Sequence, residues 1–203
     1  MKLRRQFECL SRALAADRGA QIVEFAVALP LLVVFVVGIF DFSSAFTLKQ
    51  RLTNIARDAA RASAVDPSND LQQPLSANPV SVNDVFYIVD NYLIASNLND
   101  CGLTSTATTS NLTWTFTASG NGCVTPGLTV KVNRAYYFPS TGATTPDVNC
   151  TSQNPGAQIA VIGTCVSIQY AYPWRFGQAA SLLGVTSVLP QQISAVAVSL
   201  NET

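Results

Sequence analysis

A long apolar segment near the amino terminus is the most prominent pattern in this 203-residue chain. Residues 20–46 hold two ionisable side chains, Glu24 and Asp41, and residues 25–40 hold none. At about 1.5 Å per residue, a helix over residues 25–40 covers about 24 Å and one over residues 20–46 about 40 Å. The roughly 30 Å hydrocarbon core of a bilayer lies between these lengths, so the segment is predicted to span a membrane. Asp41 ends the uncharged run and is predicted to lie at a membrane interface without a contact role.

The helix is predicted to continue beyond this segment. Apolar residues follow at spacings of three and four, which places them on one helical face: Leu48, Leu52, Ile55, Ala59 and Ala62. Residues 66–79 are rich in Pro, Ser, Asn, Asp and Gln, so the helix is expected to end near Ala64. Pro30 is expected to kink the helix, because the proline ring removes one backbone hydrogen bond and crowds the preceding turn.

A secretory signal peptide is the alternative for such a segment. Its apolar region normally covers only about 7 to 15 residues before a small-residue cleavage site, so a membrane anchor is favoured here. Five Lys and Arg residues precede the segment and four follow it within about 20 residues, a slight bias. The amino terminus is predicted to be cytoplasmic, because the cysteine-bearing half would then lie outside, where disulfides persist.

The second half of the chain predicts an α+β domain with an antiparallel sheet. Residues 81–98 show helical spacing of mostly apolar positions: Val82, Val85, Phe86, Val89, Tyr92, Leu93 and Ser96. Alternating or apolar runs then predict strands around 112–116, 128–132, 159–172 and 193–200. A helix followed by strands is an α+β order. Exposed loops are expected at 104–111, 118–122 and 140–155, and the aromatic residues in 136–138 and 170–176 are expected at core and strand positions.

Composition removes several classes of function. Only 12% of residues are charged and 48% are hydrophobic, which indicates that part of the chain does not face water. The formal net charge is zero without a dense basic cluster, so nucleic acid is not an expected partner. There is no histidine, nucleophile elbow, HExxH motif or phosphate-binding glycine loop. No catalytic residue and no cofactor are therefore predicted, and the chain is not expected to be an enzyme.

The cysteines predict two disulfides. Cys9 lies near the start, whereas Cys101, Cys123, Cys150 and Cys165 lie in the second half. Sequence order favours pairing Cys101 with Cys123 and Cys150 with Cys165, each worth about 3 kcal/mol, although three pairings remain possible. No metal is expected, because the zinc-type CxxC spacing and histidine are both missing.

Residues 18–32, with the sequence RGAQIVEFAVALPLL, resemble the processing site of type IV prepilins. The resemblance is greatest to TadE-like minor pseudopilins of the Tad (Flp) pilus system, and four residues carry it: Gly19, Glu24, Phe25 and Pro30. Residues 54–65 and 166–203 add similarity to the helix end and carboxyl-terminal strands of that family. The resemblance implies a type IV pilin-like fold, in which a long amino-terminal helix carries a small sheet domain.

The same resemblance assigns roles to individual residues. It implies that prepilin peptidase cuts between Gly19 and Ala20, and that Glu24 and Phe25 serve assembly, with Glu24 meeting the amine of a neighbouring subunit. Independently, a carboxylate in an apolar segment costs at least about 2.5 kcal/mol near a helix centre, so Glu24 requires a partner or a function. The alternative is that Glu24 lies at the cytoplasmic interface and reaches into the headgroups.

Together these patterns predict a minor pilin used to assemble a Tad-type surface pilus for adhesion or biofilm formation. The expected segments are a basic leader at 1–19, a transmembrane and stalk helix at 20–64, a linker at 65–79 and a disulfide-containing domain at 80–203. Expected partners are prepilin peptidase, the major Flp pilin, other minor pseudopilins, the inner-membrane assembly platform and the lipid bilayer. The expected location is the bacterial inner membrane with a periplasmic domain, or the pilus itself. The alternative is a membrane-tethered periplasmic binding module outside any filament.

Overall fold

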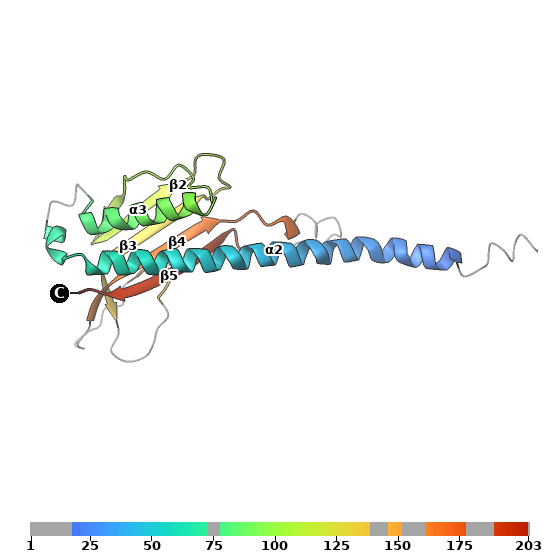
Figure 1. Ribbon diagram of the computed structural model, residues 1–203, viewed down its shortest axis with the longest axis horizontal. Coiled ribbons are helices and arrows are strands. Elements are labelled where there is room, and N and C mark those ends of the chain that lie inside the picture. The colour runs from blue at the N-terminus through green and yellow to red at the C-terminus, as the bar shows by residue number, and fades with distance from the viewer. Residues whose placement is uncertain (1–17, 73–77, 139–145, 152–160, 178–188, 203) are drawn as a thin grey trace, which may run out of the picture. The chain divides into compact units, whose positions relative to one another are not determined.

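The computed structural model describes residues 18–72, 78–138, 146–151, 161–177 and 189–202. Its helical elements are helix α2, Arg18–Val65, the 3-10 helix η1, Ser68–Gln72, and helix α3, Val80–Ala95. The strands are β1, Thr108–Ser110, β2, Thr113–Ala118, β3, Leu128–Phe138, β4, Val161–Ala171, and β5, Gln192–Leu200 (Figure 1). This order confirms the α+β class and the long apolar helix followed by a small domain with one helix and an antiparallel sheet.

The chain forms two compact units. One holds residues 1–43 and 174–189, and the other holds residues 44–173 and 190–203, called here the sheet unit. Helix α2 contributes its first part to the former and its last part to the sheet unit. The last turns of α2 therefore belong to the core of the sheet unit.

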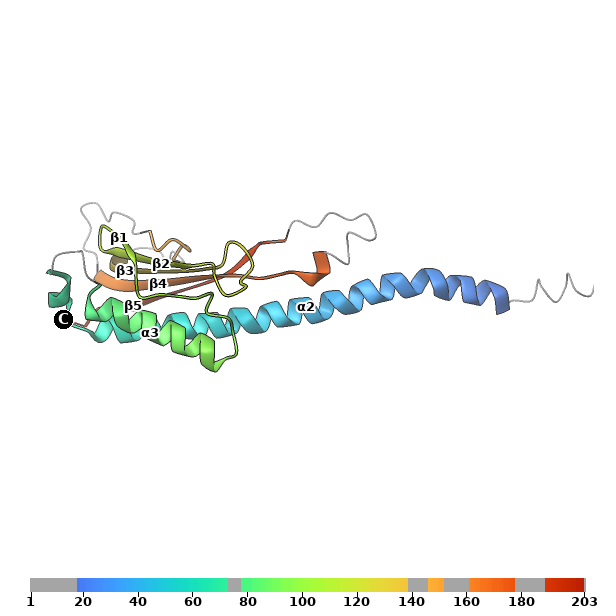
Figure 2. The same ribbon diagram turned by 90° about the horizontal axis from the view of Figure 1, so that it is seen from above.

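The described strands form an antiparallel sheet in the order β1-β2-β3-β4-β5. In its registers, Trp114 stands opposite Val132, Val132 opposite Val166, and Val166 opposite Ala197. These positions share one face, because side chains directly opposite each other in paired strands point the same way, and all four are buried. The last part of α2, residues 44–65, and helix α3 both cover this face, as Figure 2 shows.

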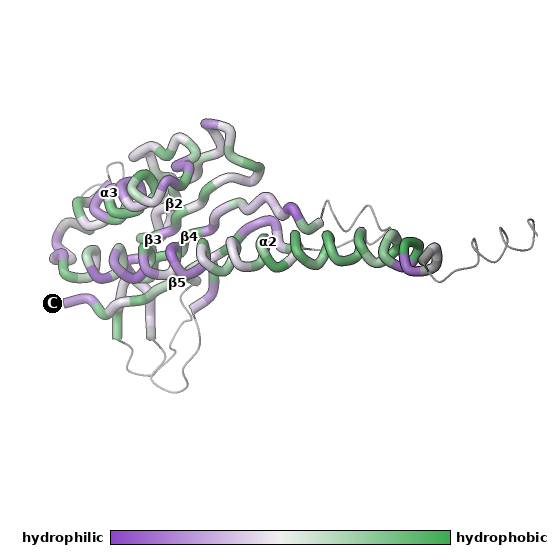
Figure 3. Tube along the Cα trace, turned by 45° about the vertical axis from the view of Figure 1, so that its right-hand side comes forward, coloured by the Kyte–Doolittle hydropathy of each residue, from purple (hydrophilic) through white to green (hydrophobic). Residues whose placement is uncertain are grey.

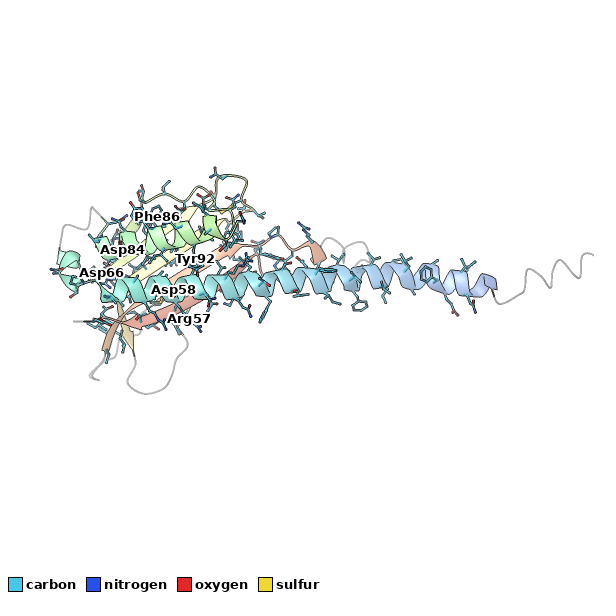
Figure 4. The ribbon with its side chains drawn as sticks, in the orientation of Figure 1. Arg57, Asp58, Asp66, Asp84, Phe86 and Tyr92 are labelled. Carbon is cyan, nitrogen blue, oxygen red and sulfur yellow. A yellow bond between two sulfur atoms is a disulfide. The ribbon has the colours of Figure 1, made fainter. Side chains whose placement is uncertain are left out.

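Helix α2 packs on the sheet through the stripe that the sequence predicted. Four of the five predicted residues are buried, namely Leu48, Leu52, Ile55 and Ala59, whereas Ala62 is half-buried. Further small side chains complete the buried face: Ala45, Ala56, Ala60, Ser63 and Ala64. Arg57 and Asp58 lie on the exposed side (Figure 4).

Helix α3 departs from its prediction at two places. Its predicted apolar residues are buried apart from Tyr92, which is 42% exposed. With about 3.6 residues per turn, Tyr92 lies roughly 80° from the centre of the buried stripe, so it reaches only the edge of the sheet. The helix also ends at Ala95, before the predicted Leu98, because Asn97 takes a positive φ of 53°.

The threonine-rich residues 104–111 were predicted to form a loop, and this prediction was wrong in part. Thr108–Ser110 form β1 and pair with β2, with Thr109 opposite Trp114. Threonine is β-branched and suits a strand, so its enrichment did not by itself indicate a loop. Residues 139–145 and 152–160, which include most of the predicted 140–155 loop and the predicted start of β4, lie outside the described residues.

The structure joins Cys101 to Cys123 and Cys150 to Cys165, the pairing that sequence order favours. The second disulfide lies on the sheet face opposite the helices. A register irregularity between Asn133 and Tyr136 brings Tyr136 to Cys150 and Cys165, and the three form a small buried cluster. This cluster holds the segment around Cys150 against the outer face of the sheet.

A buried arginine ties the end of α2 to the sheet. Arg134 is 1% exposed, and its guanidinium donates to the carbonyl oxygens of Ser63 and Asp66 and to Thr164 Oγ1. The Nη2 to Asp66 and Nη1 to Thr164 distances are both 2.9 Å. The backbone N–H of Glu202 donates to the carbonyl of Ala64 at 3.0 Å. The last carbonyls of a helix have no partner within the helix, so these distant residues complete its carboxyl-terminal end.

We predict that Arg134→Met lowers the free energy of unfolding by about 1–3 kcal/mol, because buried carbonyls at the end of α2 lose their donor. The free energy of unfolding of Arg134→Lys should lie between those of the wild type and Arg134→Met, since one ammonium cannot reproduce the planar fork of the guanidinium. The measurement is urea unfolding of the full-length protein in mild detergent, followed by tryptophan fluorescence. Arg57→Met is the control and should change stability by at most about 0.5 kcal/mol. Equal stability of the two Met variants would contradict this role.

Candidate functional site

The predicted processing site lies at the start of α2. Gly19, Ala20, Glu24 and Phe25 all fall in the first turns of this helix, which begins at Arg18 in the described residues. Gly19 is exposed, and a Cβ added to it would meet no heavy atom within 4 Å. The described residues thus leave open space beside Gly19. Residues 1–17, most of the predicted leader, lie outside the described residues.

Glu24 is exposed and is surrounded by apolar side chains of its own helix. A shallow surface groove holds its side chain together with Val23, Val27, Ala28 and Leu31, which recur at the spacing of one helical face. Phe25, the other residue assigned to assembly, is 65% exposed. In a membrane this arrangement would place one carboxylate within an otherwise apolar surface that can receive another helix.

Helix α2 carries the one stretch among the described residues that is long and apolar enough to cross a membrane. Residues 21–65 have a window with mean hydropathy of 2.7, of which 6% is buried. A core helix of a soluble protein would be mostly buried, whereas most large apolar side chains of this stretch are exposed. Figure 3 shows that hydrophobic residues predominate along this part of α2. Helix α2 continues through Pro30, so the proline does not end it, and the kink at Pro30 remains a prediction.

Asp41 makes a contact that the sequence did not predict. Its side chain is 6% exposed, and its Oδ2 accepts the backbone N–H of Phe176 at 2.9 Å. Gly38 makes room for this neighbour, because a Cβ at Gly38 would stand 2.9 Å from the Phe176 ring. The expectation that Asp41 has no contact role was therefore wrong. Its partner lies 135 residues away in the chain, beyond the reach of local spacing.

A groove of about 590 Å³ with a mixed polar and apolar lining lies on the outer face of the sheet, and the sequence did not predict it. Its lining includes hydroxyl and amide side chains from several segments: Ser110, Asn111, Thr113, Asn133, Asn149 and Thr151. Asp147 shapes one wall by accepting the backbone N–H groups of Asn149 and Thr151. The hydrogen bond from Thr151 is the largest cause that holds the pKa of Asp147 below its ordinary value. Within the described ranges, no three His, Cys, Asp or Glu residues gather as metal ligands.

Comparison with known protein families gives one match. Residues 19–61 match the family described as TadE-like protein. The comparisons with curated proteins and with solved structures gave no match. The matched residues cover the apolar part of α2 and most of the part that packs on the sheet, and they end before α3. Through residues 19–61 the chain is therefore TadE-like, as the resemblance at Gly19, Glu24 and Phe25 implied, and is consistent with a TadE-like protein of the Tad system.

Proposed function

We propose that this Tad pilus-associated protein is a minor pilin or pseudopilin, which prepilin peptidase processes and which then takes part in pilus assembly. The observation that carries the proposal is the TadE-like match over residues 19–61, which begins at Gly19 and includes Glu24. The proposed partners are prepilin peptidase, the major Flp pilin, other minor pseudopilins and the assembly platform of the inner membrane. The proposed topology has a cytoplasmic amino terminus and a periplasmic domain.

Exposure of Gly19 in the first turn of α2 supports processing after this residue. A protease must open the backbone around the bond that it cuts, and glycine is about 0.5–1 kcal/mol less favourable than alanine in a helix. Gly19 also lacks side-chain packing that opening would disrupt. The exposure of Gly19 therefore supports cleavage between Gly19 and Ala20.

The position of Glu24 supports a role in assembly. Cleavage would give Ala20 a new ammonium group, and Glu24 lies four residues later, about 6 Å along the helix axis. A carboxylate and an ammonium that share an apolar environment compensate each other, whereas either group alone is costly. Glu24 is exposed on its own helix. It is thus available to the ammonium group of a neighbouring subunit.

A membrane-tethered binding module is the second candidate, and the groove on the outer face of the sheet favours it. The groove offers hydroxyl and amide groups that suit an uncharged hydrogen-bonding ligand such as a glycan. In that function the chain would remain uncut and would not copurify with pili. Cleavage of the leader and copurification with pili therefore distinguish the two candidates.

We predict that the mature protein begins at Ala20 and that Gly19→Val blocks this processing, since the added side chain would obstruct a protease site that accepts glycine. Intact-mass measurement of the protein purified from its native membrane gives the answer. Ala26→Val is the matched control, because Ala26 is exposed on the same apolar helix, and it should be cut normally. A wild-type chain that still begins at Met1, or that is cut beyond Phe46, would rule out prepilin processing.

Glu24→Ala should leave cleavage intact and reduce the amount of protein in sheared pili at least about tenfold. Tenfold corresponds to about 1.4 kcal/mol, less than the cost of leaving a buried ammonium without its partner. Quantitative immunoblots of pili and membranes measure the distribution. Gln21→Ala removes an exposed polar side chain one turn earlier and serves as control. Normal incorporation of the Glu24→Ala protein would exclude the assembly role.

A further inference from the structure

A second segment of the chain lies against α2 where its uncharged run ends. Trp174 and Phe176, which follow β4, pack against Phe42 of the helix with their rings tilted by 55° and 50° and the ring centroids 5.3 and 5.8 Å away. The hydrogen bond from the Phe176 N–H to Asp41 and the close approach of its ring to Gly38 hold the same segment. Three kinds of contact thus fix Trp174–Phe176 beside one point on the helix.

The height of this point along α2 matches a membrane surface. Glu24 and Asp41 are separated by 17 residues, which is about 26 Å at 1.5 Å per residue. A hydrocarbon core is roughly 30 Å thick, so a helix with Glu24 near one boundary has Asp41 near the other. The aromatic rings that pack at Asp41 and Phe42 therefore stand at the level of the headgroups and the first acyl carbons.

The chemistry of the segment suits that zone. Tryptophan is enriched at membrane interfaces, where its ring meets acyl chains and its N–H meets polar groups. Trp174 and Phe176 are partly exposed, and Arg175 between them is exposed, so a cation is available to lipid phosphates. On the helix, Ile39 and Phe40 are 69% and 70% exposed at the same level. Asp41 instead directs an oxygen to a backbone N–H within the protein.

We propose that Trp174–Phe176 insert into the interfacial zone of the bilayer that α2 spans and form a second membrane contact. This inference rests on membrane anchoring of α2 and not on processing or assembly. Such a contact would hold the end of the uncharged run of α2 at the level of the headgroups.

Brominated lipids test this contact directly, because bromine quenches tryptophan at short range. The chain has two tryptophans, and Trp114 is fully buried in the sheet unit. The full-length protein is reconstituted in phosphatidylcholine vesicles with bromines near the glycerol end or near the terminus of the acyl chains. We expect greater quenching with bromines near the glycerol end, and we expect Trp174→Phe to abolish most of it. Equal quenching of the wild type and Trp174→Phe in every lipid would overturn the proposal.

Variants of Asp41 separate insertion from nonspecific exposure. Asp41→Ala removes the acceptor for the Phe176 N–H and should reduce the quenching of Trp174, whereas Asp41→Asn retains an acceptor oxygen and should preserve more of it. Asp58→Asn, at an exposed carboxylate further along α2, should leave quenching unchanged. If Asp41→Ala and Asp41→Asn both match the wild type, the contact with Phe176 does not position Trp174 in the membrane.

Discussion

The sheet unit depends on the buried guanidinium of Arg134 at the end of α2. A helix that ends against a sheet buries its last carbonyl groups, and these groups need donors from elsewhere. Arg134 of β3 supplies donors to Ser63 and Asp66, and the N–H of Glu202, just after β5, supplies Ala64. The long helix, the central strand and the carboxyl-terminal strand are therefore connected at one place. Detaching the end of α2 would break these hydrogen bonds together.

Helix α2 is one continuous element whose two parts have different surroundings. Its first part presents apolar side chains outward, as a membrane anchor does, and its last part forms core contacts with the sheet. The TadE-like match, residues 19–61, includes both parts of this helix. Leu52 and Ile55 in this last part are fully buried, so separating residues 44–65 from the sheet would expose the core of the sheet unit. The last part of α2 is thus an integral part of the sheet unit.

Local patterns in the sequence predicted the helices and strands, but they did not predict contacts between residues far apart in the chain. The uncharged run of residues 25–40 and the stripe from Leu48 depend on spacing within one helix, which the sequence displays directly. Arg134 and Asp41 depend on partners 71 and 135 residues away. Arg134 did leave a signal, because it follows Leu128, Val130 and Val132 as a charged residue on an apolar face. Asp41 left none, since an aspartate at the end of a membrane span is ordinary on the sequence alone.

The central claim is that the last part of α2 and the sheet form one cooperative structure closed by Arg134. Native-state hydrogen exchange of the full-length protein in detergent micelles measures this most directly. The account predicts that amides of residues 48–64 exchange with the same free energy as those of β3 and β4, and that Arg134→Met lowers both together. Exchange of residues 48–64 at a clearly lower free energy, while β3 and β4 stay protected, would show that the helix opens independently and would contradict the claim.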